Sequence, residues 1–272
     1  GEPVTESGGF SMKTRIFRGS FAVVTALFSA MLLWAVLSLV FMPRWQEVVQ
    51  SALSEEMLYS IRLSLLTSLI SVAIVMVLAV CIGYVLARFT FPGHHVLRTL
   101  VDLPMAFPEL VLGLCLLLLF GHGILSQWLK GFGINIVFSQ AAIVIAQVFT
   151  AAPYAIRVSY ATFRGINPRY ELVARSLGYC EFSAFWHVTL PLAKGGLFAA
   201  MVISFARCMG CFGTVLILAG GTRMFTETLP ITLYLNISYG NLAMAMTSGI
   251  ILIAISLGAI LVFELLNREV ML

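Results

Sequence analysis

Six runs of about 20 or more apolar residues recur along this chain, and they limit its fold more than any other feature. A helix needs roughly 20 apolar residues to cross about 30 Å of hydrocarbon. The sequence therefore predicts an all-α integral membrane protein with six transmembrane helices. The runs are Phe21–Met42, Ser64–Ala87, Leu97–Phe120, Ala141–Thr162, Gly195–Ala219 and Leu242–Leu265.

The amino-acid composition agrees with a membrane environment. Of the 272 residues, 60% are hydrophobic and only 10% are Asp, Glu, Lys or Arg, with a net charge of +4. A soluble domain carries about 25% charged residues, and a surface this apolar would aggregate in water. The composition therefore excludes a soluble enzyme, a disordered chain and a domain that binds nucleic acid.

The sequence contains no recognisable catalytic or metal-binding motif. The five Cys residues are interpreted as reduced thiols that act as small hydrophobic side chains. The four His residues, at positions 94, 95, 122 and 187, lack the spacing of metal ligands. No phosphate-binding Gly-x-x-x-x-Gly-Lys-Ser/Thr occurs. We therefore expect no metal and no catalysis in this chain, and ATP hydrolysis would need a separate subunit.

The Lys and Arg residues predict the orientation, because cytoplasmic loops carry more of them than loops on the other side. Six crossings place both termini on the same side of the membrane. With the N- and C-termini cytoplasmic, the cytoplasmic side holds 11 basic residues and the other side holds 4. The 11 are Lys13, Arg15, Arg18, Arg88, Arg98, Arg157, Arg164, Arg169, Arg175, Lys194 and Arg268, and the 4 are Arg44, Arg62, Lys130 and Arg223.

These patterns divide the chain into three parts. Residues 1–20 form an N-terminal cytoplasmic tail, residues 21–267 a single transmembrane domain, and residues 268–272 a cytoplasmic C-terminal end. The first apolar run is too long for a signal-peptide core and no cleavage site follows it, so we expect it to be retained as a helix. One long loop of mixed polarity, residues 163–194, lies in the cytoplasm between the fourth and fifth helices.

The long loop contains the signals of a short helix. Asn167 is a good N-cap, Pro168 fits the first helical position, and Gly178 can end the helix in a left-handed conformation. A second helix, Glu181–Val188, is expected to end at Thr189–Pro191, where the chain re-enters the membrane. A short amphipathic helix of this kind can dock into a groove on another protein or lie flat on lipid headgroups. The helical signals leave both roles open.

The residues of this loop resemble the EAA loop of ABC importer permeases. The matching segments are Glu171-Leu-Val-Ala-Arg-Ser-Leu-Gly178 and, nine residues later, Val188-Thr-Leu-Pro191. In one departure, Leu172 stands where many members have Glu, and Glu171 lies one residue earlier. The resemblance implies that ATPase subunits dock on this coupling loop. The residues that it assigns to the coupling are Asn167, Arg169, Glu171, Leu172, Ala174, Arg175, Leu177, Gly178, Leu190 and Pro191.

Three further segments resemble the molybdate, tungstate and sulfate branch of these permeases. They are Asp102–Gly113, Phe205–Gly213 and Thr226–Pro230 with the following Tyr234. The resemblance implies an inner-membrane subunit that carries a tetrahedral oxyanion by alternating access. It also implies several partners: a second copy of the chain in a homodimer, two cytoplasmic ATPase subunits that bind ATP and magnesium, and an extracytoplasmic binding protein. The surrounding lipid bilayer is the remaining partner, and no nucleic acid is expected.

One charged residue lies deep within an apolar run. Arg207 is about 12 residues into the fifth run, roughly 18 Å along a helix axis, where an ionised Arg costs a few kcal/mol unless it meets a partner or water. It could favour an anion in the translocation path, or belong to an ion pair that joins two helices. Relatives have Glu at the position of Cys211, whereas Glu109 lies at a similar depth in the third run. We therefore expect Glu109 to be the counter-charge of Arg207.

The third and fifth runs also contain residues that interrupt helices. Pro104 and Pro108 predict a kink or break, because Pro has no backbone N–H to donate. This break could line the pathway or only accommodate packing. Two Gly residues flank Phe212, which we expect to act as a gate. The predicted path consists of Pro104, Pro108, Glu109, Arg207, Gly210, Cys211, Phe212 and Gly213.

Two other classes of protein remain as alternatives. A stand-alone secondary transporter or channel would need coupling residues in the membrane, and only Asp102, Glu109 and Arg207 are available. An intramembrane enzyme would need a catalytic set, which the sequence does not offer. The solute is also open, since sulfate, thiosulfate or another small solute could replace molybdate or tungstate.

Overall fold

The computed structural model describes residues 7–41 and 43–270, and all regular secondary structure within these ranges is helical. Residues up to Glu47 and residues from Val48 onward form two compact units. The first unit contains α1, Ser7–Phe41, a single helix of 35 residues. Its apolar stretch Phe17–Leu39 is long enough to cross a membrane. Helix α1 thus includes the first predicted span, apart from Met42, which lies outside the described residues.

The rest of the described chain consists of helices of very different lengths. The helices are α2 (Trp45–Ala52), α3 (Glu55–Arg88), α4 (His94–Ala106), α5 (Glu109–Gly121), α6 (Ile124–Gly131), α7 (Gln140–Gly165), α8 (Arg169–Ser176), α9 (Glu181–Ala184), a π-helical turn (Phe185–Thr189), α10 (Leu190–Met209), α11 (Gly213–Ala219), α12 (Leu229–Ser238) and α13 (Leu242–Val270). Five stretches in the described chain are candidate membrane spans, or six if α4 and α5 are counted as one bent span. The predicted all-α membrane fold is therefore confirmed. The bounds predicted for a single domain, 21–267, stay a prediction.

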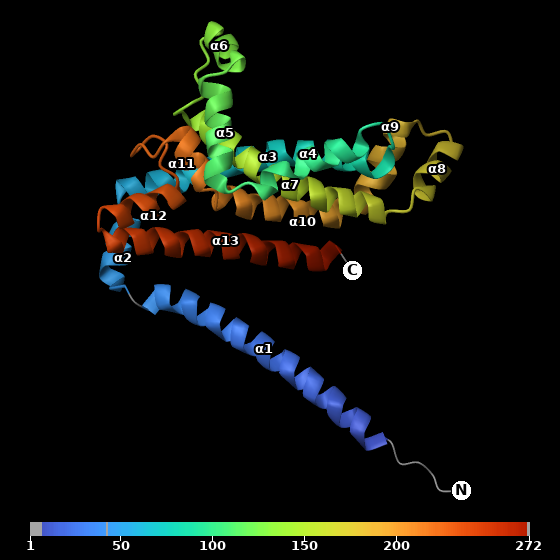
Figure 1. Cartoon of the computed structure of the whole chain (residues 1–272), viewed down its shortest axis with the longest axis horizontal. Coiled ribbons are helices and arrows are strands. Elements are labelled where there is room, and N and C mark those ends of the chain that lie inside the picture. The colour runs from blue at the N-terminus through green and yellow to red at the C-terminus, as the bar shows by residue number, and fades with distance from the viewer. Residues whose placement is uncertain (1–6, 42, 271–272) are drawn as a thin grey trace. The chain divides into compact units, whose positions relative to one another are not determined.

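Helices α3, α4, α7 and α10 lie side by side, with α8 and α9 at one end and α11 and α12 toward the other (Figure 1). The backbones of α3 and α7 approach closely where Gly83 meets Ser159. A second close approach occurs where Gly196 of α10 meets Thr162 of α7. Small residues allow such contacts, and lipid tails give little hydrophobic drive for helices to associate. Close backbone packing therefore brings these long helices together.

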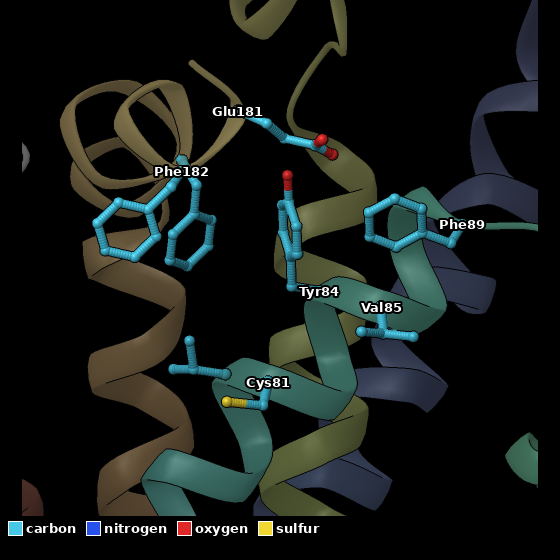
Figure 2. Close-up of a pocket in the computed structure, with 8 residues that line it drawn as sticks. Cys81, Tyr84, Val85, Phe89, Glu181 and Phe182 are labelled. Carbon is cyan, nitrogen blue, oxygen red and sulfur yellow. The ribbon is translucent and has the colours of Figure 1, made fainter. Parts of the chain in front are cut away.

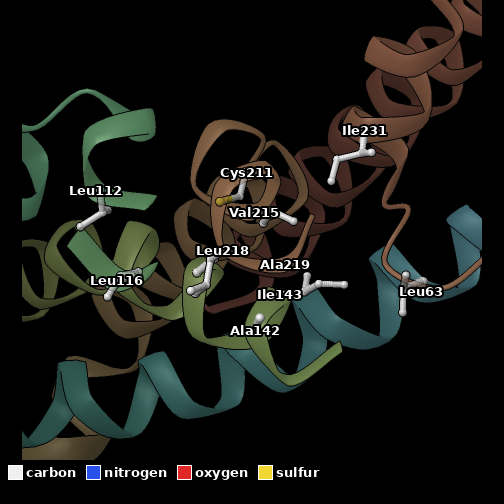
Figure 3. Close-up of a cluster of buried hydrophobic side chains, with 11 residues drawn as sticks. Leu63, Leu112, Leu116, Ala142, Ile143, Cys211, Val215, Leu218, Ala219 and Ile231 are labelled. Carbon is white, nitrogen blue, oxygen red and sulfur yellow. The ribbon is translucent and has the colours of Figure 1, made fainter. Parts of the chain in front are cut away.

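An apolar cluster forms around the short helix α11. Its buried side chains include Val215, Leu218 and Ala219 of α11, and Leu112 and Leu116 of α5. Figure 3 shows them together with further members from three other helices and from the break before α11: Leu63 of α3, Ala142 and Ile143 of α7, Ile231 of α12, and Cys211. The cluster fixes α11 among the longer helices, although α11 is too short to cross a membrane by itself.

A polar network crosses the middle of the bundle at Gln147 of α7, which is 2% exposed. The two N–H groups of its Nε2 are shared among three acceptors, Thr67 Oγ1 (3.3 Å), Ser68 Oγ (3.3 Å) and the carbonyl of Cys208 (3.1 Å). Its Oε1 accepts a hydrogen bond from Ser71 Oγ at 2.8 Å. Buried polar groups without partners are costly in hydrocarbon. Gln147 thus joins α3, α7 and α10, and both the oxygen and the nitrogen of its side-chain amide have hydrogen-bond partners.

The third predicted span is broken rather than straight. Helices α4 and α5 meet at an angle of 114°. Phe107 has the extended conformation (φ −87°, ψ 139°) that residues before Pro prefer, so the break falls at Pro108. Pro104 lies inside α4. The predicted break within the run Leu97–Phe120 is confirmed, and it divides the run into α4 and α5.

The fifth predicted span also differs from the structure. Helix α10 ends at Met209 and α11 begins at Gly213, so the run from Gly195 to Ala219 is not one helix. The predicted helix end at Thr189–Pro191 is wrong as well, because Glu181–Met209 forms one uninterrupted span. The helix contains a π-helical turn, Phe185–Thr189, just before Pro191. Pro191 has no backbone N–H to donate to the preceding turn.

The contact between α3 and α7 can be tested at Gly83. A Cβ atom there would lie 2.9 Å from Ser159 Cβ and 3.0 Å from the Tyr160 nitrogen, so Gly83→Ala forces the two backbones apart. We expect a loss of about 1–3 kcal/mol, measured as a lower melting temperature in detergent. Gly258→Ala is the matched control, because no atom lies within 4 Å of its added Cβ. Equal melting temperatures for the two variants would contradict the close packing.

Candidate translocation site and coupling loop

The short helix of the coupling loop forms where the sequence predicts it. Helix α8 runs from Arg169 to Ser176, and Asn167 Oδ1 accepts a hydrogen bond from the Arg169 nitrogen at 3.0 Å. Gly178 has a φ of +96°, and the Tyr179 nitrogen donates to the Ala174 carbonyl at 3.2 Å. The predicted left-handed end of the helix at Gly178 is confirmed.

Glu171 anchors this helix to the membrane spans. Its Oε1 lies 2.9 Å from Nε of Arg88 in an ion pair whose side chains are 8% and 15% exposed for Arg88 and Glu171. The same oxygen accepts from Thr189 Oγ1 at 2.7 Å, and Oε2 accepts from Tyr84 OH at 3.2 Å. Arg88 also donates to the Ile166 carbonyl at 3.1 Å. Glu171 therefore faces this chain itself rather than solvent.

The remaining predicted coupling residues divide between an outer and an inner side. Ala174 is buried, and Leu190 packs partly buried against a cluster around Phe163. The other side of the loop leaves charged and apolar side chains free to meet another surface. These exposed residues are Asn167, Arg169, Leu172, Arg175, Leu177, Gly178 and Pro191. Leu172 and Leu177 are 57% and 77% exposed, which suits a docking surface.

An apolar cavity of about 540 Å³ lies beside the anchor. Figure 2 shows Tyr84 with Phe89 on one side and Phe182 on the other, and Cys81 and Val85 farther along α3. Tyr84 is also in edge contact with the rings of Phe163 and Phe185. The aromatic rings around Tyr84 thus fix the position of the hydroxyl group that donates to Glu171.

Glu109 lies at the point where both broken spans meet. It is the first residue of α5, and its Oε2 accepts hydrogen bonds from the backbone nitrogens of Phe212 (3.4 Å) and Gly213 (3.1 Å). Thr214 Oγ1 donates to the Glu109 carbonyl at 3.0 Å. The Glu109 carboxylate therefore caps the start of α11 and ties it to α5.

Arg207 has a different partner. It lies in the last turn of α10, and its Nη2 donates to Tyr154 OH of α7 at 2.8 Å. The guanidinium carbon lies 4.4 Å from the centre of the Tyr154 ring, and Nε is buried without a hydrogen-bond partner. None of the ion pairs between described residues includes Arg207. The predicted ion pair between Glu109 and Arg207 is wrong, because the helix break offers Glu109 two amides.

The other predicted path residues surround this break. Gly210 ends α10 and is exposed, whereas Cys211 is buried and its Sγ lies 3.5 Å from Thr150 Oγ1. Phe212 is partly buried and contacts the ring of Tyr234 at 5.1 Å. A Cβ at Gly213 would lie 3.0 Å from Glu109 Cβ. The structure thus gathers these residues with Glu109 and Arg207, whereas Pro104 lies on α4.

The loop Gly220–Thr228 lies at the end of the spans opposite the coupling loop. Its Glu227 is fully buried and accepts a hydrogen bond from the Met224 nitrogen at 3.3 Å. Burial raises the pKa of the Glu227 carboxyl above its ordinary value, and the nearby Glu56 carboxylate raises it further. Arg223 pairs with Glu56 at 3.5 Å. The loop is therefore folded around a carboxyl group whose protonated form is more stable than that of an exposed Glu.

The sequence patterns did not single out several of these contacts. Arg88 and Tyr84 are one helical turn apart at the end of an apolar run, a spacing that indicates a shared polar contact. Gln147 and Tyr154 are polar side chains within the fourth run. A polar side chain buried in a span is costly unless it has a partner, so each of these residues indicates a contact with another helix. Their partners, however, come from other helices, so only the structure could identify them.

The comparisons with known proteins agree with this architecture. Residues 79–271 match the family described as the binding-protein-dependent transport system inner membrane component. The chain belongs to this family. It is therefore a multi-pass membrane permease component, and the predicted resemblance is confirmed.

Comparisons with individual proteins are more specific than the family match. The permease is 36% identical over 215 residues to the molybdenum transport system permease protein ModB of Mycobacterium bovis, covering 79% of this chain and 80% of the relative. It is 35% identical over 173 residues to the sulfate transport system permease protein CysW of a Synechocystis species, covering 63% of each chain. A chain in a crystal structure of a bacterial alginate ABC transporter, in complex with an alginate pentasaccharide-bound periplasmic protein, shares the fold. Its TM-score is 0.79 at 15% identity, covering 97% of this chain and 98% of that chain.

The ion pair that anchors the coupling loop of the permease can be tested by a double-mutant cycle. Removing one partner of a buried pair costs about 3–5 kcal/mol, because it leaves an uncompensated charge. We therefore expect Arg88→Met and Glu171→Gln each to destabilise strongly, and the double variant to lose less than their sum. Unfolding in mixed micelles measures the free energies. The exposed pair Arg44 and Glu47 is the control, and the same variants there should change stability by about 1 kcal/mol or less.

The role of Glu109 as a cap predicts different results for two substitutions. Glu109→Gln keeps a carbonyl oxygen that can accept from the Phe212 and Gly213 nitrogens, so we expect it to unfold much like the unchanged permease. Glu109→Leu removes the acceptor and should lose about 1–3 kcal/mol. If the two variants were equally unstable, the charge of Glu109 rather than its hydrogen bonds would matter, contrary to the capping role.

Proposed function

We propose that this permease forms the translocation pathway of an ATP-driven importer for a tetrahedral oxyanion, with molybdate or tungstate as the substrate. The similarity to a molybdenum permease over 79% of the chain supports this substrate class. The similarity to a sulfate permease supports sulfate or thiosulfate as the alternative. The permease role itself follows from the family.

We further propose that two copies of the chain form a homodimer with two ATPase subunits on the coupling loops and a binding protein at the opposite face. The observation that carries this proposal is the coupling loop, where α8 has an exposed side with Arg169, Leu172 and Leu177 and an inner side held by Glu171. In this arrangement the coupling loops and both termini face the cytoplasm. ATP and magnesium bind to the ATPase, and this chain has no catalytic role.

The transport cycle in this proposal is alternating access. Closure of the ATPase pair pushes α8, and the ion pair of Glu171 with Arg88 passes the movement to α3. The break at Gly210–Phe212 then changes the access to Arg207. A secondary transporter is less well supported, because the Glu109 carboxylate is engaged by backbone donors within the chain.

Gly178 tests the coupling role. Because its φ is +96°, Gly178→Ala places a side chain in the left-handed region at a cost of roughly 1–2 kcal/mol and should distort the end of α8. We expect ATP-driven uptake of molybdate into proteoliposomes, with the ATPase and binding protein present, to fall by about fivefold or more. Gly165→Ala in the same loop is the control, because its φ is ordinary and no atom lies within 4 Å of its added Cβ.

Sulfate uptake measured in parallel identifies the substrate. If neither anion is taken up in an ATP-dependent way by the complete complex, the proposed function is wrong. If Gly178→Ala transports as well as Gly165→Ala, the loop does not couple ATP hydrolysis to transport.

A further inference from the structure

Four arginines on α4, α7 and α10 form a feature that the proposed function does not yet use. They are Arg98 of α4, Arg157 and Arg164 of α7, and Arg207 of α10, and we call them the basic face. The sequence placed the first three among cytoplasmic loops, but Arg157 lies well within α7, eight residues before its end. Its charge must therefore be explained inside the bilayer.

The residues of α7 that belong to this feature follow a helical repeat. Tyr154, Arg157, Tyr160 and Arg164 are spaced by three or four residues, so they lie along one side of the helix. From Tyr154 to Arg164 they extend about 15 Å along the axis. The line begins beside Arg207, at the break between α10 and α11, and ends next to the coupling loop.

Tyrosine side chains hold most of these arginines. Arg207 lies over the ring of Tyr154, and both Arg98 and Arg164 lie over the ring of Tyr160, at 5.1 and 5.8 Å. Such contacts orient a guanidinium group without cancelling its charge. Only Arg157 has a carboxylate partner, Asp102 of α4, at 3.4 Å. Among these residues, four positive charges thus face one negative charge.

This excess of charge does not suit a surface in contact with lipid. The side chain of Arg157 is 58% exposed, and an ionised Arg is costly where it faces hydrocarbon. A row of guanidinium groups that borders water keeps its charges solvated. Because the row joins Arg207 to the coupling-loop end, such water would extend along the same line.

We propose that the basic face is the exit route of the oxyanion, leading from Arg207 at the break to the coupling-loop end of the spans. This inference rests on the proposed function. Each guanidinium group offers paired N–H donors that match two oxygens of a tetrahedral anion. A series of weak sites lets an anion pass where a single strong site would retain it. Asp102 keeps the central site weak, because it competes with the anion for Arg157.

A reporter thiol at residue 161 tests this route while the four arginines stay in place. Ala161 is exposed and lies one turn beyond Arg157 on the same side of α7. Ala161→Cys is made in a background where the exposed Cys81, Cys115 and Cys180 are replaced by Ser. The permease is reconstituted with its ATPase, and a sulfonate-bearing and an ammonium-bearing methanethiosulfonate reagent are compared. Val77→Cys, on an exposed apolar part of α3, is the lipid-facing control.

We expect the thiol at residue 161 to react with both reagents, the anionic one faster, and the thiol at residue 77 to react with neither. Adding Arg157→Gln should lower the ratio of anionic to cationic rates by about threefold or more, whereas Arg62→Gln on α3 should leave it unchanged. Tungstate, molybdate or sulfate should slow the reaction at residue 161.

Several results would overturn the inference. An unreactive thiol at residue 161, or a ratio that does not respond to Arg157→Gln, would show that the basic face lies against protein or lipid. Protection that appears only in vesicles with phosphatidylglycerol, and not with added tungstate, would assign the face to lipid headgroups. The labelling needs no transport, so loss of ATP-driven uptake alone would count against the proposed function and leave this result standing.

Discussion

A helix can break inside a bilayer only where other groups take over the hydrogen bonds that the break releases. In this permease the break between α10 and α11 frees donors on one side and an acceptor on the other. Glu109 accepts from the nitrogens of Phe212 and Gly213, and Gln147 donates to the carbonyl of Cys208. The two side chains come from α5 and α7. Side chains from two other helices therefore hold the irregular segment in place, and Arg207 lies beside it in the last turn of α10.

In this arrangement Glu109 joins two helices and Arg207 keeps an uncancelled positive charge. In a Glu109–Arg207 ion pair, both side chains would only have joined helices. The Glu109 carboxylate accepts hydrogen bonds from backbone donors, and Arg207 is oriented by an aromatic hydroxyl and ring. The positive charge near the break therefore lacks a carboxylate partner among the described residues. A site of this kind can attract an anion, whereas a closed pair of Glu and Arg would only hold two helices together.

The sequence was a good guide wherever a local signal determines the structure. Apolar runs of span length, the Asn167–Pro168 start of α8 and the left-handed Gly178 all appear in the structure as predicted. Pro108 also marked a break correctly, because its effect on Phe107 is local. These features depend on residues within a few positions of each other, so the pattern alone contains the necessary information.

The sequence failed where the deciding partner is distant along the chain. The end of α10 at Met209 depends on Glu109, about 100 residues away, and the orientation of Glu171 depends on Arg88. Residues 205–213 are apolar enough to be mistaken for a continuous span. Arg157 was counted among the cytoplasmic charges, because a charge in a sequence does not reveal that Asp102, 55 residues earlier, pairs with it.

Helix α3 connects the two ends of the molecule in a way that has a mechanical consequence. Near its start, Ser60 accepts from Thr232 and Ser64 accepts from the Leu229 nitrogen, so it holds α12. At its last residue Arg88 holds α8. Its 34 residues form one unbroken helix, about 51 Å long. Such a rod transmits displacement without losing it in a hinge. We therefore expect that a partner which binds at one membrane surface and displaces one end of α3 also tilts the other end of the helix.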